Sequence, residues 1–132
     1  MVMLTDHQFK LASKLSGGMK RKLSLAMALI GGSKLIILDE PTSGLDSQTS
    51  FLVMNTLKKI AKLKNKAIIC TIHQPSSNIF KLFDQLFIME RGNFIYNNSP
   101  ANITTYFESI KRPLDLMSNP ADAFMRIMEE NS

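Results

Sequence analysis

The sequence predicts an α/β fold with a mostly parallel sheet flanked by helices. Two apolar runs, at residues 35–38 and 67–72, lack alternating polar positions, which is the pattern of strands buried on both faces. Two longer stretches, before and between these runs, carry apolar residues at helical spacing. Strand and helix therefore alternate, which favours a parallel sheet covered by helices. With 132 residues, 45% of them hydrophobic, the chain is expected to form one domain or part of one.

Both long helices have clear boundaries in the sequence. The first is expected to start just after Gly17-Gly18 and to end at Ile30, where Gly31-Gly32 stops it. Apolar residues surround most of this helix, so we expect it to be well buried. The second is expected over residues 47–64, with an inner stripe made of Leu52, Val53, Leu57, Ile60, Ala61 and Leu63.

The remainder of the chain predicts shorter elements. We expect a helix over residues 77–83 and two strands, 85–90 and 93–96, around an Arg91-Gly92 turn. The last third is expected to be helical, because Ser99-Pro100 and Asn119-Pro120 each place a capping side chain before a proline. The chain thus divides into residues 1–14, which predict no definite structure, a central part at 15–98, and a helical extension at 99–132.

Composition excludes several classes of protein. A single cysteine, Cys70, cannot form an internal disulfide. No signal peptide is expected at the N-terminus, and no apolar stretch approaches the ~20 residues of a membrane-spanning helix. The net charge of +5 permits a nucleic-acid surface, but the lysines at residues 58–66 have the spacing of a solvated helix face. We therefore expect no nucleic-acid partner.

Ser16-Gly17-Gly18 is a candidate phosphate-contacting loop. Two glycines let backbone N–H groups approach an anion closely, and a helix starting there adds the positive end of its dipole. The Ser16 hydroxyl is a further donor. Taken alone, the same residues fit a simple helix N-cap after a flexible turn, and this alternative stays open.

Asp39 and Glu40 follow the first predicted strand directly. Two acidic side chains at the end of a buried strand are costly unless they serve a cation. In nucleotide hydrolases a carboxylate at this place holds Mg²⁺, often through water, and its neighbour orients and deprotonates the attacking water. We therefore predict that one carboxylate of this pair holds a metal ion and that its neighbour activates water. The alternative, an acidic residue that caps the turn after the strand, fits a paired Asp39-Glu40 less well.

Two further residues are candidates. His73 follows the second predicted strand, and in a parallel sheet it would lie at the same edge as Asp39 and Glu40, where ligands bind in open α/β sheets. It could contact a γ-phosphate, although a lone histidine is equally well explained as structural. Asp46 lies just before the second helix and fits an N-cap.

Three strings of residues together resemble the nucleotide-binding domain of ABC transporters, a P-loop NTPase-type ATPase. They are residues 15–22 (LSGGMKRK), 38–46 (LDEPTSGLD) and 71–76 (TIHQPS), and the resemblance covers nearly all of the chain from about Lys14 onward. The strings at residues 72–77, 83–86 and 119–122 look like subfamily G, the White/pigment half-transporters. Residues 15–34 are also similar to subfamily A, but the features of subfamily G extend further along the chain.

The resemblance implies a role for each candidate residue. Ser16, Gly17 and Gly18 resemble the signature loop, which in that family contacts the γ-phosphate of ATP held by the opposite domain. Asp39 resembles the Walker B aspartate and Glu40 the catalytic glutamate. Residues 43–46, which end in Asp46, resemble the D-loop of the dimer interface, and His73 resembles the switch histidine.

The same resemblance implies ATP and Mg²⁺ as cofactors, a second nucleotide-binding domain and a transmembrane domain as partners, and a place on the cytoplasmic face of a membrane. The substrate, for which a lipid or other hydrophobic compound is one option, is not encoded here. The phosphate loop with its lysine, the adenine-stacking aromatic and the Q-loop glutamine are all absent, and Met19 stands where glutamine or glutamate is common.

These departures leave three interpretations. The first is part of an ATP-hydrolysing transporter subunit whose isolated chain is inactive, because catalysis needs the phosphates to be positioned. The second is a soluble ABC ATPase without a transport role. The third is a non-catalytic module, or the product of a truncated gene, that pairs with a complete nucleotide-binding domain.

Overall fold

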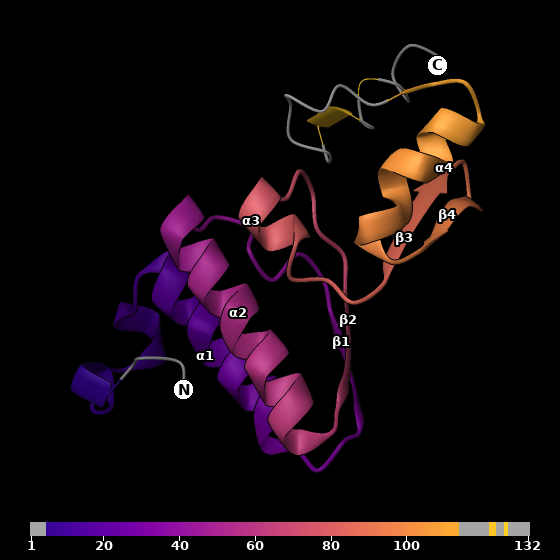
Figure 1. The fold of residues 1–132 in the computed structure, drawn as a ribbon. Coiled ribbons are helices and arrows are strands. Elements are labelled where there is room, and N and C mark those ends of the chain that lie inside the picture. Colours follow the sequence, from indigo (N-terminus) through magenta and orange to yellow (C-terminus); the bar gives the residue numbers. More distant parts are fainter. Residues whose placement is uncertain (1–4, 114–121, 124–125, 127–132) are drawn as a thin grey trace. The chain divides into compact units, whose positions relative to one another are not determined.

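The structure, a computed structural model, describes residues 5–113, 122, 123 and 126. It divides into two compact units, the first ending at His73 and the second beginning at Gln74. Figure 1 shows the elements in chain order. Each unit is described by itself. The predicted cap at Asn119-Pro120 lies outside the described residues.

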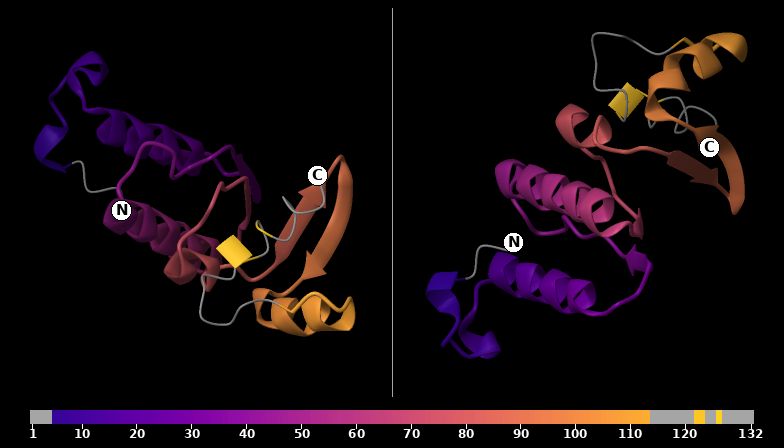
Figure 2. Two further views of the ribbon diagram at one scale, coloured as in Figure 1. Left: turned by 90° about the horizontal axis from the view of Figure 1, so that it is seen from above. Right: turned by 60° about the horizontal axis from the view of Figure 1, so that its bottom comes forward.

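The first unit is built on a parallel pair of strands. It contains, in order, 3₁₀ turns at Thr5–His7 and Ala12–Lys14, helix α1 (Gly17–Ile30), strand β1 (Leu35–Leu38), helix α2 (Ser47–Lys64) and strand β2 (Ala67–Cys70). The strands pair in parallel from Leu35 beside Ala67 to Leu38 beside Cys70. Both helices lie on the same side of this pair (Figures 1 and 2). The predicted β-α-β order is therefore confirmed.

Side-chain caps explain where the helices begin. Ser16 accepts a hydrogen bond from the Met19 amide at 3.3 Å, and Asp46 accepts one from the Thr49 amide at 2.9 Å. Each bond satisfies one of the donors left free at a helix start. Helix α2 ends at Lys64, and the next residue, Asn65, adopts the left-handed conformation typical of a C-terminal cap. The predicted bounds of α2 are confirmed at both ends, and α1 begins at Gly17, slightly earlier than predicted.

Three expectations about burial are wrong for the described residues. Strand β2 has no fully buried residue, since Ile69 is 52% exposed, and it ends at Cys70, before Ile72. Helix α1 buries only Leu25, whereas Met27 is 65% and Ile30 83% exposed. Strand β1 buries one face alone, because Ile36 and Leu38 are buried while Ile37 is 72% exposed. The physical reason is that both helices lie on one side of a two-stranded pair, so the described residues cover only that side.

The interior of the first unit is formed mainly by residues from β1 and α2, together with Leu25 of α1 and Leu15 and Pro41 from the connecting segments. Within α2 the buried residues are Ser50, Val53, Met54 and Leu57. The predicted stripe is thus confirmed at Val53 and Leu57. It is wrong at Leu52, which is 38% exposed, and at Leu63, which is 82% exposed near the helix end.

The second unit is a β-hairpin with helical turns around it. It contains helix α3 (Ser77–Phe80), strands β3 (Leu86–Glu90) and β4 (Asn93–Asn98), a 3₁₀ turn at Pro100–Asn102, and helix α4 (Ile103–Ser109). Arg91 and Gly92 connect the strands with φ of +48° and +81°, as a two-residue type I′ turn requires. The hairpin is antiparallel, so among the described strands one pair is parallel and one is not.

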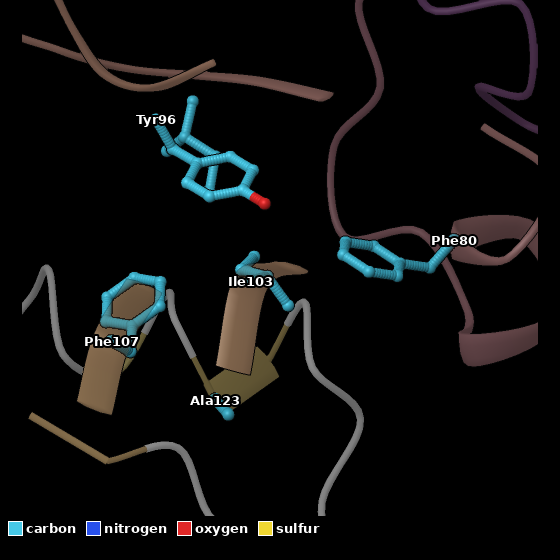
Figure 3. Packing of buried hydrophobic residues seen from close by; sticks show 6 residues of the cluster. Phe80, Tyr96, Ile103, Phe107 and Ala123 are labelled. Carbon is cyan, nitrogen blue, oxygen red and sulfur yellow. The ribbon is translucent and has the colours of Figure 1, made fainter. Parts of the chain in front are cut away.

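One apolar cluster holds this unit together. Its buried residues come from both strands, from α3 and α4, and from Ala123 beyond α4 (Figure 3): Phe80, Ile88, Tyr96, Ile103, Phe107 and Ala123. The Tyr96 hydroxyl donates to the Ser99 carbonyl at 2.6 Å, and Ser99 in turn caps the following turn by accepting from the Ala101 amide. The predicted Ser99-Pro100 cap is confirmed, whereas the helix at residues 77–83 is shorter than expected.

Candidate functional site

The two candidate carboxylates lie at the carboxyl end of the parallel pair. Asp39 and Glu40 follow β1, and Thr71 follows β2. Since Leu38 pairs with Cys70, the next residues along both strands, Asp39 and Thr71, come side by side. The Thr71 hydroxyl donates to Oδ1 of Asp39 at 2.6 Å and accepts from the Glu40 amide at 2.9 Å. The edge of the sheet thus holds both acidic residues in place.

Arg21 reaches the same two residues from helix α1. Its Nη2 donates to the main-chain oxygen of Asp39 at 2.6 Å and also to the main-chain oxygen of Glu40. Both carboxylates remain exposed, since the arginine contacts the backbone and not the acidic groups. This contact joins the helix that begins at Gly17 to the loop that carries the acidic pair.

Glu40 has an unusual backbone. Its φ of +44° lies in the left-handed region, which costs a non-glycine residue about 1–3 kcal/mol. Such a conformation persists when the surroundings fix it, and here the bonds from Thr71 and Arg21 do so on both sides of the residue. Strain of this kind is concentrated at functional sites. Because other residues, among them Asn65 and Arg91, share this conformation, the bonds from Thr71 and Arg21 are what distinguish Glu40.

The predicted phosphate-contacting loop, Ser16-Gly17-Gly18, is accessible to solvent at its first two residues. Ser16 and Gly17 are exposed, and a Cβ atom added at Gly17 would meet nothing within 4 Å. At Gly18 an added Cβ would lie 3.1 Å from Cδ2 of Leu45, so glycine allows this loop to approach residues 43–46. The Ser16 hydroxyl oxygen accepts the capping hydrogen bond from the Met19 amide, and its hydrogen stays available as a donor. The N-cap interpretation of this loop is therefore confirmed and leaves phosphate contact open.

Asp46 begins helix α2. Hydrogen bonds from Thr49 lower the pKa of its carboxyl below the ordinary value of 3.8. The N-cap expected for Asp46 is confirmed, while a contact with nucleotide stays a prediction. His73 lies three residues beyond the end of β2 and is exposed; among the described residues no hydrogen bond joins it to Asp39 or Glu40.

The acidic pair fits a magnesium ion only in part. Among the described residues, no group of three or more histidine, cysteine, aspartate or glutamate side chains could hold a metal ion. Asp39 uses Oδ1 for Thr71 and keeps a second oxygen. Because Mg²⁺ is usually held by one or two carboxylates together with water and substrate phosphates, a single free oxygen agrees with this mode of binding.

Sequence reasoning missed two residues of this site. Thr71 could have been found by aligning the predicted strands at their carboxyl ends, which places it beside Asp39. Arg21 gave no comparable signal, because its contact depends on how α1 packs near the loop after β1.

Comparison with known proteins supports the same interpretation. The family described as ABC transporter matches residues 2–43, and the family described as ABC-2 type transporter matches residues 73–131. Among the described residues no helix combines the length and apolar character that crossing a membrane requires.

Several curated relatives are named as members of subfamily G. ABC transporter G family member 1 of Dictyostelium discoideum is 45% identical over 86% of this chain and 14% of that protein. ATP-binding cassette sub-family G member 8 of Homo sapiens is 41% identical over 84% of this chain and 16% of its own length. This chain thus spans about a sixth or less of these relatives.

A solved structure shows the fold. MJ1267, an ATP-binding cassette of an ABC transporter, superposes with a TM-score of 0.67 at 21% identity, over 83% of this chain and 44% of that one. With the α/β order, the acidic strand end and the relatives above, this chain belongs to the ABC transporter family, as part of a nucleotide-binding domain of subfamily G.

Proposed function

We propose that this chain is the hydrolysis-triggering part of an ATP-hydrolysing domain that powers an ABC transporter of subfamily G. The observation that carries the proposal is the acidic pair at the end of β1, held by Thr71 and Arg21 with Glu40 in a left-handed conformation. In open α/β sheets ligands bind at this edge. The strain and the converging bonds are the features expected of a functional site.

Each residue has a defined part in the proposal. Glu40 orients the attacking water and accepts its proton, and His73 contacts the γ-phosphate as a hydrogen-bond partner. Asp39 holds Mg²⁺ through its free oxygen or through water. The ion, when bound, neutralises charge that develops on the phosphates.

The loop at Ser16-Gly17-Gly18 serves a second nucleotide. It contacts the γ-phosphate of ATP held by a partner nucleotide-binding domain, through the Ser16 hydroxyl and the amides at the start of α1. Residues 43–46, including Asp46, lie along the interface between the two domains. The close approach of Gly18 to Leu45 supports this, since it brings the two segments together.

The proposal places the domain on the cytoplasmic face of a membrane, joined to a transmembrane domain. The isolated 132 residues are expected not to hydrolyse ATP, because they contain no phosphate loop with its lysine. Positioning the phosphates supplies most of the catalysis in this class of reaction.

A chimera tests the proposal. Residues 15–113 replace the matching segment in the nucleotide-binding domain of the Dictyostelium relative, once that domain has been found to hydrolyse ATP. Glu40→Gln should reduce the turnover number by about 100-fold or more while ATP binding is retained, because only the proton acceptor is lost. The matched control is Glu108→Gln, an exposed glutamate on α4, which should leave turnover unchanged. Normal turnover in the Glu40→Gln chimera would refute the proposed role.

Mixing the isolated chain with a complete nucleotide-binding domain tests the alternative of a non-catalytic partner module. The missing phosphate loop favours this alternative, since the chain could still supply Ser16-Gly17-Gly18 to the partner. Stimulation of the partner's ATP hydrolysis that is lost with Ser16→Ala would support it.

A further inference from the structure

We infer that Thr71 is a positioning residue that fixes both acidic residues of the candidate site at once, Asp39 by its carboxylate and Glu40 by its main-chain amide. The inference rests on the proposed function, because it concerns how Asp39 and Glu40 are presented. It adds a residue to which the sequence motifs gave no role.

The parallel register places Thr71 at the required position. Its amide donates to the Leu38 carbonyl at 3.1 Å, which extends the pairing of β1 and β2 by one step beyond the strands. The side chain of Thr71 therefore stands beside Asp39 as a consequence of strand pairing. A flexible loop would not fix the two residues in this way.

The hydroxyl group makes two different contacts. A hydroxyl has one hydrogen to donate and lone pairs to accept with. The hydrogen goes to Oδ1 of Asp39, and the oxygen accepts from the Glu40 amide. One atom thus fixes the carboxylate of the first acidic residue and the main chain of the second.

This arrangement determines what the carboxylates can do. With Oδ1 of Asp39 bound to Thr71, the second oxygen keeps a fixed direction and, among the described residues, accepts no hydrogen bond. It is therefore free for a metal ion or a metal-bound water. The amide contact supports the left-handed backbone of Glu40, which sets the direction of its side chain.

Thr71 also links the two strand ends. His73 follows it by two residues, so a displacement of this segment changes the contact to Asp39 as well as the position of His73. The threonine therefore connects the residue proposed to contact the γ-phosphate with the residue proposed to hold the metal.

Three variants of the chimera test the inference. Thr71→Val removes the hydroxyl at nearly constant volume, Thr71→Ser keeps it, and Thr105→Val makes the same change at an exposed position on α4. We expect Thr71→Val to raise the half-saturating Mg²⁺ concentration about tenfold and to lower the turnover number, with ATP binding in the absence of Mg²⁺ unchanged. Thr71→Ser should stay within about threefold of the parent, as should Thr105→Val.

A second measurement does not need turnover. Hydrogen exchange of the Glu40 amide should be about tenfold faster in Thr71→Val, because its acceptor is lost, and unchanged in Thr71→Ser. It can be made in the chimera and in the 132-residue chain.

The outcomes separate this inference from the proposed function. If Glu40→Gln abolishes turnover while Thr71→Val keeps the parent's Mg²⁺ dependence and amide exchange, the role of Thr71 is wrong and the proposed function stands. A loss in Thr71→Ser equal to that in Thr71→Val would also overturn it, since the hydroxyl would then not be the active feature. If Glu40→Gln retains turnover, the proposed function fails, and amide exchange still decides whether Thr71 holds Glu40.

Discussion

Replacing Arg21 with methionine should destabilise the first unit and leave the second unchanged. The guanidinium of Arg21 donates to the main-chain oxygens of Asp39 and Glu40, which connects helix α1 with the end of β1. Methionine keeps most of the apolar stem but has no donor. The substitution therefore removes these two contacts and little else.

The size of the effect follows from these bonds. A hydrogen bond contributes about 0.5–1.5 kcal/mol net, so losing two costs about 2 kcal/mol. Arg21 is partly buried, so water cannot fully replace the lost hydrogen bonds. With a urea m-value of about 2 kcal/mol per M, the unfolding midpoint of the first unit should fall by about 1 M.

The chain contains a spectroscopic means of separating the units. It has no tryptophan, and its two tyrosines, Tyr96 and Tyr106, both lie in the second unit. Among the residues that the structure describes, the long helices lie in the first unit: α1 and α2 have 14 and 18 residues, against 4 and 7 for α3 and α4. Far-ultraviolet circular dichroism therefore reports mainly on the first unit, and tyrosine fluorescence on the second.

The matched control is Lys59→Met, which removes an exposed cation from α2. It should move neither transition by more than about 0.25 M, as expected of a surface substitution. The reasoning is refuted if Arg21→Met leaves the circular dichroism midpoint in place. It is equally refuted if both probes shift together, because the loss would then not be confined to the first unit.

Three further predictions concern stability. Phe107→Ala should cost about 3–5 kcal/mol in the transition seen by tyrosine fluorescence, because Phe107 is only 2% exposed within the apolar cluster; a loss below 1 kcal/mol would contradict the assigned core. Gly92→Val should cost about 1–3 kcal/mol at φ of +81°, and Gly92→Asn clearly less; equal losses would argue against the type I′ turn. The lowered pKa of Asp46 implies a contribution to stability that is present above pH 3.8 and is lost as the pH falls through the folded-state pKa. Asp46→Asn keeps a capping oxygen but has no carboxyl to titrate, so the helicity of this variant should depend less on pH below 4. Identical acid titrations of Asp46→Asn and the parent would contradict that shift.

Local features of the fold were predictable from the sequence. The caps at Ser16, Asp46 and Ser99 and the turn at Arg91-Gly92 are set by residues close in sequence, and all four are present. Their chemistry needs no distant partner, since a capping oxygen or a glycine acts within its own turn. Helix bounds at α2 were therefore correct at both ends.

Burial was predicted less well, because it depends on what covers each face. The apolar residues of α1 and β1 indicated full burial, yet Ile30 and Ile37 are exposed in the described structure. Periodicity reports which faces are apolar and carries no information on which neighbour lies against them.

The candidate site was predictable in its acidic residues but not in what holds them. A paired carboxylate after an apolar strand is visible in the sequence, so Asp39 and Glu40 could be named. The contact from Arg21 is a tertiary one, and the left-handed backbone of Glu40 has no sequence signal, since glutamate does not favour it. The roles of these residues in nucleotide chemistry remain predictions.

The exposed face of the sheet and the missing phosphate loop have the same explanation: the sequence has the pattern of a larger α/β domain than the described residues form. Ile37 and Ile69 lie on the outer face of β1 and β2 at 72% and 52% exposure, although each stands in a run with the composition of a doubly buried strand. Apolar burial contributes about 25 cal/mol per Å², so side chains of this kind on both faces are favourable only where both faces are covered. The likeness to a solved cassette extends over 44% of that chain. The sequence therefore carries the burial pattern of a larger α/β domain than the described residues build, and a phosphate loop is one of the parts such a domain would add.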